Sequence, residues 1–182
     1  MSKPKVINLY GGPCAGKSTL RAAVFAELKF QEYQLEEILE YAKDAAWQKR
    51  GIKLFRAQDY IFGKQHFRLN TVTDEVDLVI TDSPILMSQV YIGPNWPMPS
   101  LRGMIDEAYA QYNNLDIFID RGRNYDPKGR NQTEQEAIEI DDKILNLLEE
   151  KTSVFYRVKF GREAVFEIIE LMKNGKFLPA RE

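Results

Sequence analysis

The chain has 182 residues, which is about the length of one domain with a sizeable core. Of these residues 44% are apolar and 29% are charged, and the formal net charge of -2 at pH 7 excludes a chain-wide basic surface for nucleic acid. A single cysteine excludes an internal disulfide, and one cysteine with one histidine argues against a structural zinc site.

The sequence contains no stretch that approaches the roughly 20 apolar residues of a membrane-spanning helix. Its start, "MSKPKVINLY", is basic but has neither the apolar stretch nor the cleavage site of a secretory signal. We therefore expect a cytoplasmic protein without a membrane partner. No internal repeat, low-complexity segment or linker interrupts the sequence, so we expect one domain over residues 1–182.

Short apolar runs rich in β-branched residues alternate with helical patterns along the chain. This alternation predicts an α/β fold, a doubly wound parallel sheet of about five strands. The expected strands cover residues 6–10, 78–81, 115–120 and 153–158. The stretch "YQLEEIL", residues 33–39, fits either a further strand or the start of a helix that runs to Arg50.

Helices are expected between and after these strands, over residues 17–29, 57–70, 100–112, 133–150 and 162–173. Ser100 is the expected N-cap of its helix. Thr133 and Glu136 have the spacing of a capping box, and Asn174 with Gly175 ends the last helix. The apolar stripe expected on the 133–150 helix consists of Ala137, Ile140, Ile144, Leu147 and Leu148.

The stretch "GGPCAGKS", residues 11–18, lies between the first expected strand and the first expected helix. It fits the phosphate-loop pattern of Gly, four free positions, Gly, Lys and Ser or Thr. Lys17 would reach the β- and γ-phosphates of ATP, and the Ser18 hydroxyl would ligate Mg²⁺. We therefore expect ATP and Mg²⁺ as cofactors. The residues expected to bind the nucleotide in this loop are Gly11, Gly12, Pro13, Cys14, Ala15, Gly16, Lys17, Ser18 and Thr19.

Asp82 follows the expected strand 78–81, which should lie beside the first strand. Its carboxylate would then arrive near Ser18 and the metal. Two roles remain open for it: holding Mg²⁺ through water, and accepting a proton from the substrate. A plain turn-capping role before Pro84 is the structural alternative.

The segment "RGRNYDPKGR" follows the expected strand 115–120 and is rich in basic residues. Charge that develops on a transferring phosphoryl group needs Arg or Lys donors, and a flexible arginine-rich lid can supply them while it excludes water. We expect such a lid over about residues 121–133. Arg121 and Arg123 are its strongest catalytic candidates, and Arg130 is the next candidate for a nucleotide contact.

The loop "GGPCAGKST", the "TDSP" after a strand and the lid with "RGR" together resemble the nucleoside and nucleotide kinase group of phosphate-loop proteins. The lid is similar to those of deoxynucleoside and thymidylate kinases. The stretch "EYAKD", residues 40–44, resembles the substrate-side segment of nicotinamide riboside kinase-like ATPases. The whole chain also resembles small phage-type kinases that bind ATP, which implies the host cytoplasm as an alternative location.

This resemblance implies roles for residues on the acceptor side. Glu40 would lie near the substrate hydroxyl as a base or an anchor, and Gln65 would face a base or ring. Apart from the resemblance, Trp96 with Tyr91 in the proline-rich stretch "YIGPNWPMPS" could form an aromatic wall for a planar base, with core packing as the alternative. Ser83 stands where deoxynucleoside and thymidylate kinases have Arg, so the resemblance leaves the acceptor open.

The sequence favours an ATP- and Mg²⁺-dependent phosphotransferase that acts on a nucleoside-like or nucleotide-like small molecule. A second hypothesis is a kinase that acts on DNA, at a 5'-hydroxyl end or a hydroxymethylated base. A nucleotide-dependent switch or binding module is the alternative from another class. A homodimer is possible in each case.

Overall fold

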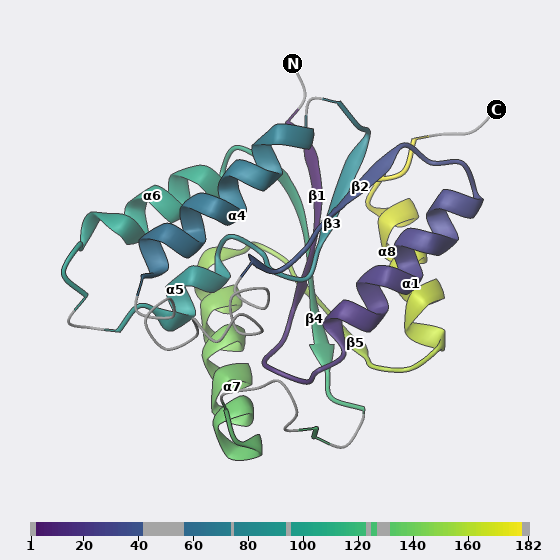
Figure 1. Ribbon diagram of the computed structural model, residues 1–182. Helices are drawn as coiled ribbons and strands as arrows, with labels where there is room; N and C mark the ends of the chain where they lie inside the picture. The colour runs from purple at the N-terminus through teal and green to yellow at the C-terminus, as the bar shows by residue number, and fades with distance from the viewer. Residues whose placement is uncertain are drawn as a thin grey trace.

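In the computed structural model of the chain, the described residues are 3–41, 57–73, 75–93, 96–122, 125–126 and 132–179. Their strands form one parallel sheet in the order β2-β3-β1-β4-β5 (Figure 1). The strands are β1 (Lys5–Tyr10), β2 (Leu35–Ile38), β3 (Leu78–Thr81), β4 (Asn113–Asp120) and β5 (Tyr156–Lys159). The expected parallel sheet of about five strands is confirmed, and the ambiguous stretch 33–39 contains a strand.

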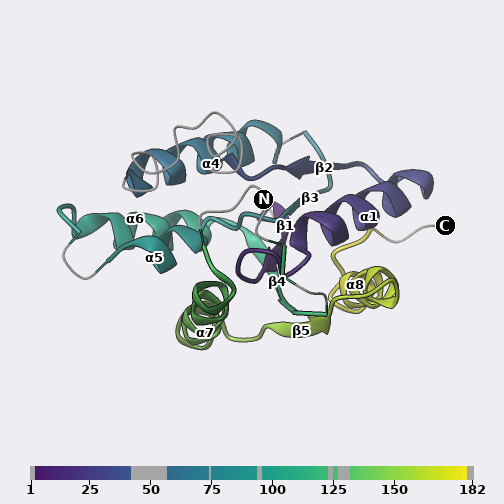
Figure 2. The ribbon, with the colours of Figure 1, turned by 60° about the horizontal axis from the view of Figure 1, so that its bottom comes forward.

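Helices cover both faces of the sheet, as expected of a doubly wound fold (Figures 1 and 2). One face carries α1 and α8, and the other carries α4, α5, α6 and α7. The helices are α1 (Lys17–Phe30), α4 (Gln58–Val72), α5 (Met87–Tyr91), α6 (Ser100–Tyr109), α7 (Glu134–Lys151) and α8 (Glu163–Asn174). The short helix α5 has no counterpart among the elements expected from the sequence.

Alternation along β1 divides the core into two layers. Val6 and Tyr10 are buried with the α4 to α7 side, whereas Ile7 and Leu9 are buried with α1 and α8. Successive side chains of a strand point to opposite faces, and parallel strands covered on both faces are apolar on both. The sequence "VINLY" therefore serves both layers at once.

Several element boundaries differ from the sequence expectation, and the N-cap of α6 and the start of β5 are two examples. Ser100 is the first residue of α6 and Pro99 is its N-cap, without a side-chain capping hydrogen bond, so the expected Ser100 cap is wrong. The last strand begins at Tyr156 rather than at Ser153, and among its residues only Val158 is buried. Within the described part of the chain, β5 is an edge strand and pairs with β4 alone. Because an edge strand is partly exposed, its apolar residues do not mark where the strand begins and ends.

The expected capping box at the start of α7 is confirmed. The Thr133 hydroxyl accepts from the Glu136 amide at 3.2 Å, and the Glu136 carboxylate accepts from the Thr133 amide at 2.7 Å. The same Thr133 contact holds the pKa of Glu136 below its usual value. This box fixes where α7 begins, and α7 brings a buried carboxylate to the site described next.

The register of the sheet places several loop starts at one edge. Asn8 of β1 lies opposite Thr81 of β3, and Tyr10 lies opposite Phe118 of β4. Because the strands are parallel, the segments after β1, β3 and β4 all leave the sheet at its carboxyl edge. This edge lies at the end of the sheet away from the N terminus (Figure 1).

Candidate functional site

The loop between β1 and α1 has the backbone of a phosphate-binding turn. Gly11 and Gly16 have φ values of 139° and 103°, and Cys14 has a φ of 66°. Gly16 is the N-cap of α1 and no side chain caps that helix. Successive amides in such a turn, together with a helix N-terminus, form a concave site that favours an anion.

Lys17 lies across this loop. Its Nζ donates to the carbonyl oxygens of Gly11, at 2.6 Å, and Gly12, at 3.2 Å. The side chain is half-buried and belongs to the first turn of α1. The ammonium therefore lies at the loop, where a bound phosphate group would replace the carbonyl contacts with a stronger charge-assisted one.

Asp82 follows β3, which pairs with β1 as the sequence predicts. Its side chain is 4% exposed, and its Oδ1 lies 3.4 Å from Nε of Arg21. Arg21 also donates to Glu37 of β2. Since Arg21 comes three residues after Ser18 on α1, the two share a face of the helix, and the Asp82 carboxylate lies against that face.

The environment of Asp82 fits a hard cation. Apart from the ion pair with Arg21, its Oδ1 makes no hydrogen bond with any residue that the structure describes. Magnesium sites commonly use one carboxylate with phosphate and water oxygens. Within the described ranges no group of three or more His, Cys, Asp or Glu could hold a metal alone, so phosphate and water would have to complete the ligand set.

Arg121 lies at the phosphate loop. Its Nη1 donates to the Pro13 carbonyl at 2.7 Å, and its Nη2 donates to the Ala137 carbonyl of α7 at 2.9 Å. Its Nε donates to Asp141 at 2.5 Å. The residue that the sequence assigns to a lid is thus bound to the loop and to α7, and its catalytic role stays a prediction.

Asp126, from the expected lid, and Phe160, from outside it, also approach the loop. The amide of Asp126 donates to Sγ of Cys14 at 3.3 Å. Phe160, which follows β5, packs on the loop so closely that a Cβ on Gly16 would lie 2.1 Å from its ring. Arg123 and Arg130 lie outside the described residues.

The acceptor-side candidates gather near the end of β2. Oε1 of Gln65, a residue of α4 that is 3% exposed, accepts from the amide of Tyr41 at 3.4 Å. Gln65 therefore lies beside the chain at Glu40. Its Nε2 is buried without a hydrogen-bond partner among the residues that are described. Buried polar groups normally have a partner, and a bound ligand could provide one here.

The hydroxyl of Tyr91 is influenced by the charges of both Glu40 and Asp141. Burial raises the pKa of its hydroxyl, and the negative charges of Glu40 and Asp141 raise that pKa further. Trp96 is half-buried and packs with Tyr91 against the core of this face, so core packing accounts for part of its surroundings. The structure thus brings Glu40, Gln65 and Tyr91 into one region.

Sequence reasoning missed Asp141, Arg21 and Glu37. Arg21 is one of the buried residues of α1, although its neighbours in the buried stripe are apolar. Asp141 likewise stands in the buried stripe of α7 between Ile140 and Ile144. A charged residue at an apolar position of a helix was therefore the signal available in the sequence.

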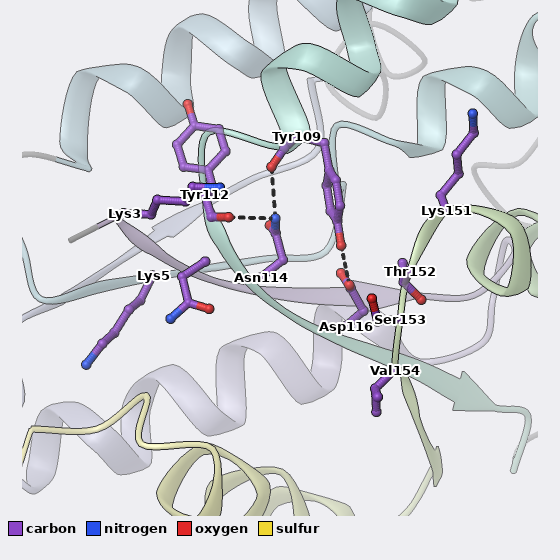
Figure 3. A pocket seen from close by; sticks show the side chains of 11 residues that line it. Lys3, Lys5, Tyr109, Tyr112, Asn114, Asp116, Lys151, Thr152, Ser153 and Val154 are labelled. Atoms are coloured by element: carbon purple, nitrogen blue, oxygen red, sulfur yellow. Dashed lines mark hydrogen bonds between the residues drawn. The ribbon is translucent and has the colours of Figure 1, made fainter. Parts of the chain in front are cut away.

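A separate cavity of about 590 Å³ lies at the opposite edge of the sheet, where β1 and β4 begin (Figure 3). Its lining includes Lys5, Asn114 and Lys151, and Tyr109 donates there to the buried Asp116. Because the phosphate loop follows the other end of β1, this cavity is remote from the candidate site.

Among the described helices, none is long and apolar enough to cross a membrane.

A family model described as an AAA domain matches residues 6–164 of the chain. A search of curated proteins finds no match. Many solved structures match the chain, and three that share the fold at low sequence identity are the following.

Deoxyadenosine kinase from M. mycoides, with dCMP and a flexible dCDP bound, is 18% identical with a TM-score of 0.53, and the match covers 93% of this chain and 97% of that one. APS kinase from Mycobacterium tuberculosis, in complex with AMPPNP and APS, is 14% identical with a TM-score of 0.53, over 95% and 99% of the two chains. Shikimate kinase from Acinetobacter baumannii, in complex with shikimate, is 19% identical with a TM-score of 0.56, over 94% of each chain. The resemblance to phosphate-loop kinases is thereby confirmed at the level of the fold.

Proposed function

The chain belongs to the AAA-domain family whose model spans residues 6–164, and from this premise we propose that it is a phosphotransferase. It moves the γ-phosphoryl group of ATP to a hydroxyl or phosphate of a nucleoside-like or nucleotide-like small molecule. The observation that carries this proposal is that Arg121, from the same chain, donates to the Pro13 carbonyl within the phosphate loop.

On the donor side, the loop and Lys17 hold the phosphates of ATP. The positive φ values at Gly11, Cys14 and Gly16 shape a backbone cradle, and Lys17 Nζ already lies within it. Arg121 stands on the same loop and supplies positive charge where charge develops on the transferring group. An arginine held in place by its own chain favours transfer over a switch that would need an arginine from a partner.

Mg²⁺ would be held by the Ser18 hydroxyl and the Asp82 carboxylate, and it would neutralise charge on the β- and γ-phosphates. Asp82 brings a buried carboxylate oxygen without a hydrogen bond among the described residues. Arg21 orients this carboxylate through an ion pair, in which Arg21 Nε lies 3.4 Å from Asp82 Oδ1.

On the acceptor side, Glu40 and Gln65 bind and orient the substrate. Gln65 has an amide nitrogen free of partners within the described structure, and a ligand carbonyl or ring nitrogen would satisfy it. The deoxyadenosine kinase holds dCMP and dCDP, and the APS kinase holds APS beside the ATP analogue AMPPNP. The ligands dCMP and APS support a nucleotide-like acceptor class. Arg123 and Arg130 complete the lid over the γ-phosphate in this proposal.

Incubation with γ-labelled ATP, Mg²⁺ and a panel of acceptors tests the proposal. The panel contains nucleosides, nucleotides, shikimate-like polyols, 5'-hydroxyl DNA and hydroxymethylated DNA. Wild type gives acceptor-dependent labelled product with a small molecule, and Lys17→Ala reduces transfer by at least about 100-fold because it removes a transition-state charge. Lys29→Ala, at the exposed other end of α1, keeps wild-type transfer.

Product on DNA alone, with activity that falls steeply with salt, would replace the small-molecule acceptor by a polynucleotide. No acceptor-dependent product, together with slow hydrolysis and a nucleotide-dependent protein partner, would overturn the proposal in favour of a switch. Circular dichroism of Lys17→Ala checks that the lost transfer does not come from a lost fold.

A further inference from the structure

Asp141 is the only charged residue among the buried residues of α7. The others are Ala137, Ile140, Ile144, Leu147 and Leu148. Asp141 is 9% exposed. Because burial of an ionised carboxylate is costly unless it is paired and hydrogen-bonded, its place in an apolar stripe requires partners.

Both carboxylate oxygens of Asp141 have a partner at the phosphate loop. Oδ1 accepts from the Gly12 amide at 2.5 Å, and Oδ2 accepts from Nε of Arg121 at 2.5 Å. These partners are far apart in the sequence, since 129 positions separate Gly12 from Asp141. One side chain therefore joins the loop after β1 to the segment after β4.

Arg121 is held from three sides as a result. Its Nε meets Asp141, its Nη1 meets Pro13 and its Nη2 meets Ala137. A guanidinium has five N–H groups, so after these contacts with described residues two remain for a ligand. A free arginine side chain loses rotamer entropy when it is fixed, and these contacts fix it before the substrate arrives.

The fit around Gly12 is close. A Cβ at residue 12 would lie 2.6 Å from the Ala137 oxygen, 2.8 Å from Arg121 Nη2 and 2.8 Å from Asp141 Oδ1. Gly12 thus has no room for a side chain between the loop and α7. The Gly12 amide also stands at the start of the loop, before the turn that Cys14 and Gly16 shape with positive φ, so Asp141 fixes the entry of the cradle without filling it.

We propose that Asp141 is a positioning residue, which holds the Arg121 guanidinium and the Gly12 amide in register so that the free N–H groups of Arg121 meet the transferring phosphoryl group. The inference rests on the phosphotransferase proposed above. Asp141 itself touches no substrate. It acts through Arg121, as second-layer carboxylates orient catalytic groups elsewhere.

The variant Asp141→Asn separates the two partners of the carboxylate. An amide oxygen can still accept from Gly12, but the amide nitrogen is a donor and faces the donor Nε of Arg121. We expect kcat for transfer to fall by about 10- to 100-fold, while KM for ATP changes by less than about 3-fold. Asp142→Asn, at the exposed neighbouring position of α7, is the matched control and keeps wild-type kcat.

A second comparison distinguishes positioning from simple support of the fold. In an Arg121→Gln background, adding Asp141→Asn causes no further loss of kcat, because the group that Asp141 positions is already absent. The same addition raises the midpoint of thermal unfolding above that of Arg121→Gln alone, since it removes a buried carboxylate without its cation. The comparison of Arg121→Gln with the double variant therefore still tests the positioning role if Asp141→Asn alone does not fold.

The outcomes are distinguishable. Side-chain ¹H–¹⁵N spectra should show an Arg121 Nε–H signal protected from exchange in wild type and in Asp142→Asn, and unprotected in Asp141→Asn. Wild-type kcat in a folded Asp141→Asn, or a further drop of kcat in the double variant, would overturn the positioning role while the phosphotransferase stands. Absence of transfer by wild type with every acceptor would overturn both.

Discussion

Gly16 has a backbone and a neighbour that exclude any side chain. Its φ is 103°, and an added Cβ would lie 2.1 Å from the ring of Phe160. An L residue resists that φ, and a ring packed on the loop leaves no space. The glycine that the phosphate-loop pattern requires is therefore needed here for two physical reasons.

Gly16→Ala should lower the free energy of unfolding by about 3 kcal/mol, from backbone strain and overpacking of about 1–3 kcal/mol each. It should also abolish nucleotide binding, because the loop must shift to admit the methyl group. Urea denaturation gives the first quantity, and titration with a fluorescent ATP analogue gives the second.

Gly63→Ala is the control for the same substitution. Gly63 lies inside α4, and a Cβ there meets nothing within 4 Å. Alanine at an exposed helix position should raise the free energy of unfolding by about 0.5–1 kcal/mol. Equal effects of alanine at residues 16 and 63 would contradict the account of Gly16.

At the scale of elements, α6 and α7 show how helix starts differ. Thr133 caps α7 through a complete capping box, whereas Ser100 is the first residue of α6 and makes no capping bond. The helix start at 100 follows Pro99, whose fixed φ suits this position without a side-chain acceptor. A serine before a helical pattern is thus a weaker indicator than the Thr-x-x-Glu spacing, in which two side chains must agree.

Thr133→Ala should reduce the free energy of unfolding by about 1 kcal/mol through the loss of this cap. Ser100→Ala, also exposed, should change it by less than about 0.5 kcal/mol. Chemical denaturation of both variants under one condition tests the pair, and a larger effect at residue 100 would contradict the assigned helix starts.

Whether residues 33–39 form a strand or a helix depended on more than their local sequence pattern. The stretch 33–39 contains both apolar and acidic residues, which suits a helix as well as a strand. The structure pairs β2 with β3, from Leu35 opposite Leu78 to Ile38 opposite Thr81. Thr81 also donates its hydroxyl to the Ile38 carbonyl at 2.9 Å. Partners some 40 residues away along the chain, rather than the local sequence, made this element a strand.

At the scale of the whole molecule, Asp116 links the pH to the stability of the fold. This carboxyl lies inside β4, 2% exposed, and accepts from Asn8 of β1 at 2.9 Å and from Tyr109 of α6. Burial raises the pKa of Asp116 above its usual value, although its hydrogen bonds oppose the shift. Between the unfolded and the folded pKa the native state therefore holds a proton that the unfolded chain has released.

It follows that the contribution of Asp116 to stability is complete below pH 3.8, its ordinary pKa, and declines as pH rises through its folded pKa. Asp116→Asn cannot titrate there. The free energy of unfolding of this variant minus that of wild type should increase with pH across this window and then become constant. Urea denaturation at a series of pH values measures the difference, and a difference that stays flat or decreases would contradict the raised pKa.

The sheet order explains why the candidate site lies where it does. In the order β2-β3-β1-β4-β5, β1 lies between the strands that precede Asp82 and Arg121. The loop after β1 thus begins between the ends of these two strands, where Arg121 contacts Pro13 of the loop and Asp82 contacts Arg21 of the helix that follows it. The cavity at the amino edge of the same strands shares none of these residues (Figure 3).

The sequence by itself determined the phosphate loop, the parallel sheet, most helices and the α7 cap. These features depend on residues close together in the chain, where periodicity, glycine spacing and capping pairs act directly. It also named Lys17, Asp82 and Arg121 as candidates, because each stands at the end of a strand or in a recognisable motif. Glu40 and Gln65 were candidates through the resemblance to kinases alone. Their catalytic and binding roles remain predictions.

Only the tertiary structure decided which residues meet. Arg121 and Pro13 are 108 residues apart, and Gly12 and Asp141 are 129 apart, so no local pattern could pair them. The pairing depends on strand order, on register and on the seating of α7 against the loop. In the sequence, Asp141 is one of several acidic residues on the same helix. Only the structure shows that its carboxylate is buried and contacts both Arg121 and the Gly12 amide.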